Sequence, residues 1–358
     1  MKPTYHTATY RTDVLKEHID NPLITGIPAQ FEPKEAHRRL KSIPRIPEQE
    51  LSQGNKIELL MGLEKRVIIP TNYHIDLYQH LYARIVSGYE SRNPVRPEVI
   101  EWTLDAAENE PVFELDDEDD PTSTGTGVLG KTGLGKTTTV VSVLRRLIPQ
   151  CIRHTREDFK DIQITYLVVE MPHNGVIESL CLSFFKAIDN ALLLTDTEES
   201  YFNHYSTKKV NSGVMLQKIH FLCRKHHLGL LVIDELQNLL VQGAKRRQLM
   251  LNFLSTLTNI SHVPIVKIGT SDALHLFKVK KTNIRRKGAT FQLLPYAKTN
   301  KYWKQLLEAL FDFQLAPIPL PDTPENRSYL YELTQGYPYA LLALWREIQI
   351  YAVQAGSK

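Results

Sequence analysis

Cysteine is scarce in this sequence. Its 358 residues include three cysteines, Cys151, Cys181 and Cys223. They are odd in number and lie too far apart along the chain to form a zinc knuckle or a redox pair. We therefore expect three reduced and mostly buried thiols in a cytoplasmic protein.

Long apolar runs are also absent. The strongly apolar stretches are short, and none approaches the roughly 20 residues that a helix needs to span a bilayer. Residues 1–6 lack the apolar centre of a signal peptide. With 42% hydrophobic and 23% charged residues, the composition is that of a soluble globular protein with roughly two or three packed units. We expect no membrane partner.

Charge of one sign is missing from parts of the chain, although the net charge is only +3. Residues 101–120 hold ten acids, whereas residues 273–307 hold nine lysines and arginines and no acid. The acidic run 114–120 indicates an exposed linker or hairpin tip, with an acidic metal site as the alternative. The basic stretch is typical of a solvated face, but also of a nucleic-acid surface or a subunit contact.

Two signatures of other nucleotide-dependent enzymes are missing. A GTPase would need an Asn-Lys-x-Asp motif to bind the base, and the nearest string, at residues 300–303, lacks the Asp. The His-Arg-Asp signature of kinases is absent as well. These absences argue against both classes.

An octapeptide fits the phosphate-loop pattern G-x-x-x-x-G-K-[ST] at every fixed position. It consists of Gly130, Lys131, Thr132, Gly133, Leu134, Gly135, Lys136 and Thr137. Glycines let the backbone curl so that its N–H groups point at phosphate oxygens. The Lys136 ammonium then approaches the β- and γ-phosphates, and the Thr137 hydroxyl can bind Mg²⁺.

The context of this loop supports a nucleotide site. Residues 127–129 predict a short apolar strand before it, and residues 138–144, beginning with Thr138, predict a helix after it. The N-terminal dipole of that helix favours a bound anion. The alternative, a glycine-rich turn without a ligand, would carry the Lys-Thr pair by accident.

A second pair of residues completes the expected site. The apolar strand 228–233 is followed by Asp234 and Glu235, at the edge of a parallel sheet where such folds bind ligands. Asp234 would hold Mg²⁺, and Glu235 would polarise the water that attacks the γ-phosphate. A strand-end acid alone is often only a cap, but beside a phosphate loop the pair predicts ATP hydrolysis.

Two further positions are candidates for nucleotide sensing. Thr270 follows the apolar strand 263–268, where its hydroxyl or amide can bridge between Glu235 and the γ-phosphate; an ordinary polar strand end is the alternative. Arg285 or Arg286 is a candidate arginine finger for a neighbouring subunit, worth about 10³–10⁵ in rate. The alternative is a pair of solvated arginines.

Strand and helix patterns alternate after the phosphate loop. The strands are expected at 162–169, 228–233 and 263–268, and the helices at 175–194, 216–226 and 248–257, with a polar insertion at 195–210. This alternation predicts an α/β fold with a parallel sheet and helices on both faces.

Three regions are expected from these patterns. Residues 1–66 look like an N-terminal extension, possible partner-binding, rich in proline and expected to dock on its own domain or on a neighbour. Residues 67–295 form the nucleotide-binding domain. Residues 296–358 form a small helical lid, with helices expected at 301–311 and 329–355.

The order of phosphate loop, strand-end acids, sensor strand, arginines and helical end resembles an AAA+ ATPase. More narrowly, the chain resembles the TnsC family, the AAA+ regulators of Tn7-like transposons, including CRISPR-associated ones. The resemblance spans most of the chain and rests on these segments: residues 21–24 with Pro28, 88–89 with 92–94, 173–175, 228–237, 251–253, 268–270, 285–288 and 331–336.

The resemblance implies a P-loop NTPase fold of the AAA+ type, with the sheet sandwiched by helices. It implies ATP and Mg²⁺ as cofactors. The Walker A, Walker B and sensor-1 roles would fall to Lys136, Thr137, Asp234, Glu235 and Thr270, and the trans arginine to Arg285 or Arg286. Arg346 in the lid is a loose match for a second sensor and can equally face solvent.

The same resemblance implies ATP-dependent homo-oligomers, rings or filaments, on double-stranded DNA. Further implied partners are transposase and endonuclease subunits of the TnsB and TnsA type and a target selector of the TniQ or TnsD type. Candidate DNA contacts are His173, Asn174, Lys208 and Lys209, with surface solvation as the alternative. Such contacts to phosphates would be sequence-independent and salt-sensitive.

Two other functions stay open at this point. The chain could be a helicase-loader or initiator-like AAA+ protein, although nothing in the sequence indicates a helicase partner. It could also be a nucleotide-switched scaffold with little hydrolysis, which Glu235 argues against.

Overall fold

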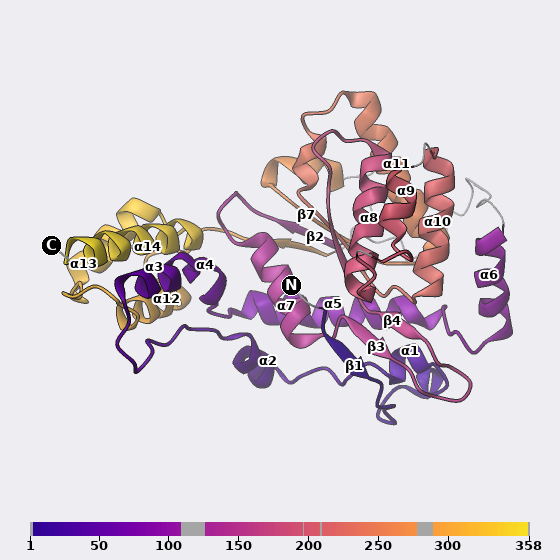
Figure 1. Cartoon of the computed structure of the whole chain (residues 1–358), viewed down its shortest axis with the longest axis horizontal. Helices are drawn as coiled ribbons and strands as arrows, with labels where there is room; N and C mark the ends of the chain where they lie inside the picture. The colour runs from indigo at the N-terminus through magenta and orange to yellow at the C-terminus, as the bar shows by residue number, and fades with distance from the viewer. Residues whose placement is uncertain (1–2, 109–125, 196, 208–209, 278–288, 357–358) are drawn as a thin grey trace. The chain divides into compact units, whose positions relative to one another are not determined.

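The computed structural model describes residues 3–108, 126–195, 197–207, 210–277 and 289–356 (Figure 1). Internal contacts divide the chain into two compact units. The sheet unit consists of Met1–Gln30, Tyr78–Leu129 and Leu144–Gln292. The helical unit consists of Phe31–Leu77, Gly130–Val143 and Leu293–Lys358. The functional regions expected from the sequence, 1–66, 67–295 and 296–358, stay a prediction.

The described residues form short strands and mostly longer helices. The strands are β1 (Tyr5–Thr7), β2 (Thr126–Leu129), β3 (Cys151–Arg153), β4 (Ile162–Ile164), β5 (Leu167–Glu170), β6 (Leu231–Asp234), β7 (Ile265–Gly269) and β8 (Thr290–Gln292). The α-helices are α1 (Pro22–Thr25), α2 (Pro33–Leu40), α3 (Gln53–Met61), α4 (Leu63–Arg66), α5 (Asn72–Glu90), α6 (Pro97–Glu108), α7 (Lys136–Leu147), α8 (Ile177–Leu192), α9 (Tyr201–Ser206), α10 (Ser212–Lys225), α11 (Ala244–Ser261), α12 (Lys301–Asp312), α13 (Pro324–Thr334) and α14 (Pro338–Ala355). The 3-10 helices are η1 (Lys16–His18), η3 (Leu236–Leu239) and η4 (Ser271–Phe277).

The main sheet of the sheet unit has five parallel strands in the order β5-β6-β7-β2-β8. β7 therefore lies between β2 and β6, with Gly269 opposite Leu129 on one side and Lys267 opposite Ile233 on the other. Apart from the edge strand β8, whose residues are mostly exposed, the strands are apolar and largely buried, as expected when helices cover both faces. The predicted α/β fold with a parallel sheet is confirmed.

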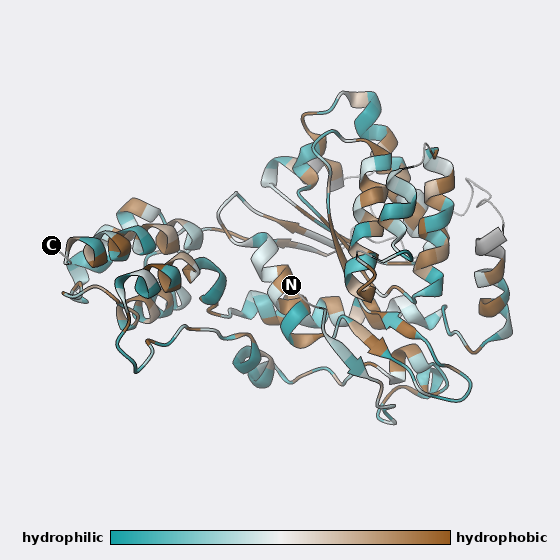
Figure 2. Ribbon diagram, viewed as in Figure 1, coloured by the Kyte–Doolittle hydropathy of each residue, from teal (hydrophilic) through white to brown (hydrophobic). Residues whose placement is uncertain are grey.

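One face of this sheet carries the larger core. Helices α8, α10 and α11 pack there around Phe184, Phe185 and Leu254, and α9 packs on α8. On the opposite face, His80 Nε2 of α5 lies 2.7 Å from Thr126 Oγ1 of β2. Figure 1 shows α8 to α11 grouped on one side of β2 and β7 and α5 on the other. In Figure 2 the strands of this sheet are largely brown, whereas the helices around them carry both brown and teal residues.

Residues 3–30 belong to the sheet unit rather than forming a free tail. β1 pairs in parallel with β3, which pairs antiparallel with β4 in a second, three-stranded sheet. The short α1 is buried along its whole length. Asn21 donates its side-chain amide to the Tyr89 carbonyl at 2.8 Å, and Gln163 donates to the Leu23 carbonyl at 2.9 Å. These contacts attach residues 3–30 to the sheet unit, whereas the expected role of 1–66 as an extension stays a prediction.

The helical unit has a separate apolar core. Trp303 of α12 and Trp345 of α14 are almost fully buried there, together with Leu60 of α3 and Leu63 of α4. Segments from both ends of the chain therefore share one core. The predicted helical character of residues 296–358 is confirmed, with α12, α13 and α14 as its helices.

The expected strand at 162–169 is wrong as a single element. It is divided into β4, which pairs with β3, and β5, which pairs with β6 in the other sheet. The break lies at Thr165, whose N–H donates to the Gln150 carbonyl at 2.9 Å and whose hydroxyl donates to the Pro149 carbonyl at 2.5 Å. The apolar pattern is continuous because both halves are buried, although in different sheets.

The expected helix at 329–355 is also divided. α13 ends at Thr334, and the next two residues, Gln335 and Gly336, have positive φ values of 50° and 74°. An added Cβ on Gly336 would lie 2.0 Å from the Tyr296 carbonyl oxygen, so only glycine fits there. Pro338 then begins α14, as is favourable at a first helical position.

The three cysteines are free and buried, as predicted. Burial raises the pKa of each thiol, Cys151, Cys181 and Cys223, to about 12. They are therefore unreactive thiols that pack in the core. Within the described ranges, no helix combines the length and the apolar character needed to cross a membrane.

Candidate functional site

The phosphate loop, residues 130–137, continues directly from the end of β2 and runs into the start of α7. Gly133 and Gly135 both have φ values of 82°, which are unfavourable for other residues. This backbone explains two of the glycines, and Thr139 N–H donates to the Gly135 carbonyl at 2.8 Å as α7 begins. The Lys136 ammonium donates to the Lys131 carbonyl at 3.2 Å. The loop therefore has the curled form that its sequence predicts.

Within the helical unit, the loop contacts the beginning of α14. Tyr339 N–H donates to the Gly133 carbonyl at 3.3 Å, and an added Cβ on Gly133 would lie 3.7 Å from the Tyr337 ring. Sequence reasoning did not identify these two tyrosines. In the sequence they appear only as one tyrosine on either side of Pro338, a pattern that is not specific to nucleotide binding.

Arg346, the loose match for a second sensor, lies further along α14. Its guanidinium pairs with Glu64 of α4 and with Glu347, the latter at 2.8 Å. These carboxylates also raise the pKa of Arg346. The side chain thus joins α14 to α4, and its sensor role stays a prediction.

The acidic turn, residues 234–239, follows β6 in the sheet unit. Asp234 is the last residue of β6 and is 8% exposed. It lies opposite Glu170, the last residue of β5. Glu235 follows in the left-handed conformation, with φ 55° and ψ 38°, and its N–H donates to Asp234 Oδ1 at 2.7 Å. The carboxyl ends of β5, β6 and β7 thus gather acidic and polar groups at one sheet edge.

Gln237 is a residue of this edge that sequence reasoning did not assign a role. Its side-chain Nε2 donates to Glu235 Oε2, and its Oε1 accepts from Thr270 N–H at 3.2 Å. The main-chain amide of Thr270 is therefore joined to Glu235 through Gln237. The sequence contained only a weak signal for this contact, namely a polar residue in the first turn after the acidic pair.

The packing under Thr270 is close. An added Cβ on Gly269 would lie 3.4 Å from Leu236 Cβ and 3.4 Å from Ala273 Cβ. Gly269 therefore allows the end of β7 to approach the acidic turn. The structure brings Asp234, Glu235 and Thr270 to one sheet edge, as their positions after neighbouring strands predict.

The sheet edge offers few protein ligands for a metal ion. Among the described residues, no three His, Cys, Asp or Glu side chains form a group that could hold a metal ion by themselves. Mg²⁺ usually binds through one or two carboxylates together with phosphates and water rather than in an all-protein cage. One buried strand-end carboxylate, Asp234, is compatible with that mode of binding.

The predicted DNA contacts His173 and Asn174 lie beside the start of α11. Gln242 donates to the His173 carbonyl at 2.6 Å, and Arg246 donates to the Asn174 carbonyl at 3.2 Å. Lys245, Arg246 and Arg247 occupy the first turn of α11, which has no acid. The N-terminal end of a helix carries partial positive charge, which adds to the charge of these three side chains. Residues 245–247, here called the cationic turn, therefore create a strong local positive potential.

Four predicted residues lie outside the described part of the chain. These are Lys208 and Lys209 in the insertion and Arg285 and Arg286 in the basic stretch. The acidic run 114–120 lies outside it as well.

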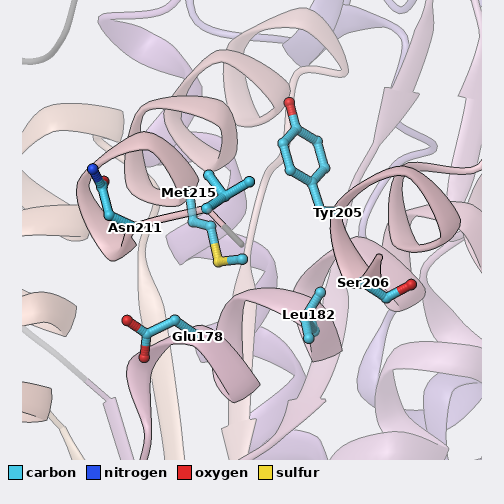
Figure 3. A pocket seen from close by; sticks show the side chains of 7 residues that line it. Glu178, Leu182, Tyr205, Ser206, Asn211 and Met215 are labelled. Atoms are coloured by element: carbon cyan, nitrogen blue, oxygen red, sulfur yellow. The ribbon is translucent and has the colours of Figure 1, made fainter. Parts of the chain in front are cut away.

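A pocket of about 410 Å³ lies elsewhere in the sheet unit, between α8, α9 and the start of α10. Glu178, Leu182, Tyr205 and Met215 are among the residues that line it (Figure 3). None of the residues predicted to bind nucleotide or DNA lines this pocket.

Comparison with known proteins identifies the type of domain. Residues 123–277, which contain β2, the phosphate loop, the acidic turn and β7, match the family model of an AAA domain. No curated protein matches the chain. The match and the parallel sheet flanked by helices give these residues a fold of the P-loop AAA+ type.

Several solved structures are similar to the chain at low sequence identity. A Walker-type ATPase of Pyrococcus abyssi is similar over 74% of this chain and 73% of its own, at 16% identity and a TM-score of 0.42. The Orc1 protein of Aeropyrum pernix, solved in complex with DNA, is similar over 73% of this chain and 63% of its own, at 16% identity and a TM-score of 0.42. PCH-2 of C. elegans is similar over 75% and 70%, at 11% identity and a TM-score of 0.34.

Proposed function

We propose that the chain is an ATPase whose nucleotide state controls its assembly on double-stranded DNA. The observation that carries this proposal is a complete phosphate-loop motif directly after β2. In the same sheet β6 ends at Asp234, Glu235 follows it, and β7 lies between β2 and β6. An AAA domain match over the same residues supports it.

The phosphate loop would bind the triphosphate through its backbone N–H groups, from Gly130 to Thr138. The Lys136 ammonium supplies positive charge toward the β- and γ-phosphates. Thr137 and Asp234 would hold Mg²⁺, which neutralises charge on the phosphates when it is bound. These residues have the oxygen ligands that this cation prefers.

Glu235 would act as the general base for hydrolysis. Its carboxylate would orient a water and accept its proton as the water oxygen bonds to the γ-phosphorus, while the bond from this phosphorus to the oxygen that bridges to the β-phosphate breaks and ADP leaves. Thr270 would report the state of the γ-phosphate to this carboxylate. Arg285 or Arg286 from a neighbouring copy would stabilise the charge that develops in the transition state.

The proposed output is transposition, as the resemblance to the TnsC family implies. In this role the protein forms a ring or filament on duplex DNA and links a target selector of the TniQ or TnsD type to TnsA- and TnsB-type subunits. The positive charge of the cationic turn, next to His173 and Asn174, supports contact with DNA phosphates. Lys208 and Lys209 are proposed as further contacts.

Electron microscopy with ATP, Mg²⁺ and duplex DNA tests the assembly, with ADP as the control. We expect oligomers on DNA with ATP, trapped by Glu235→Gln and abolished by Lys136→Ala. A protein that neither retains ATP nor changes its association state with the nucleotide would disprove the proposal.

The DNA surface is tested separately by the salt dependence of binding. Lys245→Gln together with Arg247→Gln should lower the slope of log Kd against log salt by about 2, because each lost phosphate contact accounts for about 0.9. Lys160→Gln, on an exposed position elsewhere in the sheet unit, is the matched control. An unchanged slope in the double variant would exclude the cationic turn from the DNA interface.

A further inference from the structure

The side chain of Gln237 occupies a position between two strand ends. Its two polar atoms have different partners, because Nε2 donates to Glu235 Oε2 and Oε1 accepts from Thr270 N–H at 3.2 Å. A carboxamide is suited to this arrangement, since it offers a donor on one side and an acceptor on the other. Neither a carboxylate nor an apolar side chain could serve both partners.

The turn that carries Gln237 is anchored on both sides. Leu236 and Leu239 of η3 are fully buried in the core of the sheet unit. Asn238 donates its side-chain amide to the Met171 carbonyl, after the end of β5, at 2.7 Å. The backbone of Gln237 is therefore fixed by its neighbours, so its side chain acts from a defined position.

The residue that Gln237 contacts is conformationally constrained. Glu235 has φ 55° and ψ 38°, a left-handed conformation that is unfavourable for a residue with a side chain. With its backbone turned in this way, the direction of its carboxylate depends on the groups that bind it. Gln237 supplies one such group directly.

We propose that Gln237 is a positioning residue for ATP hydrolysis, which holds the Glu235 carboxylate and couples it to the main chain of Thr270. This inference rests on the proposed function. A shift at the end of β7 moves the Thr270 amide, and the carboxamide transmits that shift to the general base. The nucleotide is bound by other residues, so Gln237 affects turnover and not affinity.

Two substitutions of similar size separate this role from plain packing. Gln237→Met keeps the length of the side chain and removes both hydrogen bonds. Gln237→Glu keeps an acceptor for Thr270 N–H but places a second carboxylate against Glu235. The control is Gln248→Glu, the same change at an exposed position on α11, where the side chain contacts Asn252.

The test measures kcat for ATP hydrolysis and the Kd of ATP for the full chain, with thermal unfolding as a check on folding. Both Gln237 variants should lose about 10- to 100-fold in kcat, because small displacements of a catalytic group are costly. Their Kd should stay within about 3-fold of wild type, as expected for a group that acts only in the chemical step. The control should match wild type in both quantities.

Three results would overturn the inference. One is a kcat near the wild-type value in both variants, and another is an increase in kcat. The third is a joint loss of affinity and thermal stability with unchanged turnover per bound nucleotide, which would mean a purely structural role. If the wild type itself bound or hydrolysed no ATP, the proposed function would fail first, and this inference with it.

Discussion

The phosphate loop and the acidic turn are held in different ways. The loop has its form because Gly133 and Gly135 adopt positive φ values, so its shape is a property of a few adjacent residues. The acidic turn depends on partners that are distant in the sequence. Gln237 joins it to Thr270, and Asn238 joins it to Met171.

Under the proposed function, this difference would separate nucleotide binding, by the loop, from hydrolysis, at the turn. Backbone N–H groups in a glycine-rich loop suit a triphosphate, whose many oxygens need donors and not a particular side chain. A general base needs one carboxylate in one orientation, which side-chain hydrogen bonds supply. We therefore expect changes in the loop to weaken nucleotide binding and changes in the turn to slow hydrolysis.

The largest expected effect is that of Glu235→Gln on turnover. If Glu235 is the general base, as proposed, kcat should fall about 10²- to 10⁴-fold, while the Kd of ATP changes little because the proposed phosphate contacts are made by the loop. Steady-state hydrolysis and binding of a fluorescent ATP analogue check both quantities. If the Glu235→Gln variant hydrolysed ATP at the wild-type rate, Glu235 would not be the general base. The contrast between a loop that binds and a turn that acts in hydrolysis would then lose its support.

Lys136→Ala should have the opposite profile. The loss of a charged hydrogen bond to phosphate costs about 1.5–3 kcal/mol, which corresponds to about a 10- to 100-fold weaker Kd for ATP. This increase in Kd should be detectable by ATP titration alone, without a hydrolysis assay. Lys160→Ala, on an exposed position outside the loop, is the control, and equal affinity in both variants would argue against a phosphate-binding lysine.

A smaller effect is expected from Gly133→Ala. There is room for the methyl group, since an added Cβ would lie 3.7 Å from the Tyr337 ring, but φ 82° is unfavourable for alanine by about 1–2 kcal/mol. We expect a lower free energy of unfolding by about that amount, and weaker ATP binding.

Gly54→Ala is the matched control for that substitution. Gly54 lies within α3 of the same unit and lacks a positive φ, so alanine there should be neutral or stabilise by about 0.5–1 kcal/mol. Chemical unfolding and ATP titration measure both variants. If they behaved alike, the backbone conformation of the loop would not be the reason for its glycines.

Much of the sheet unit could be predicted from local patterns. Short apolar runs followed by polar residues indicated β2, β6 and β7, and the acids after β6 were expected at a sheet edge. The run 162–169 shows where this reasoning stops. Both of its halves carry apolar residues, and their pairing with β3 and with β6 divides them.

The candidate site was predicted to a similar extent. Asp234, Glu235 and Thr270 were expected at one sheet edge because each lies at or after the end of an apolar strand, and that placement is what the structure has. Gln237 was not, since its role depends on the register that brings Thr270 within 3.2 Å of its side chain. Tyr337 and Tyr339 were missed for the same reason, because their contact with Gly133 joins residues some two hundred positions apart in the chain.

By itself, the sequence determined the features that depend on neighbouring residues: the glycine conformations of the phosphate loop, the apolar strands and the acids at the end of β6. The tertiary structure decided which strands are neighbours, how residues 31–77 share a core with the C-terminal helices, and which side chain holds Glu235. The physical reason is the distance along the chain over which each kind of interaction acts. Backbone preferences act over a few residues, whereas hydrogen bonds and apolar contacts between distant segments form only when the whole fold brings them together.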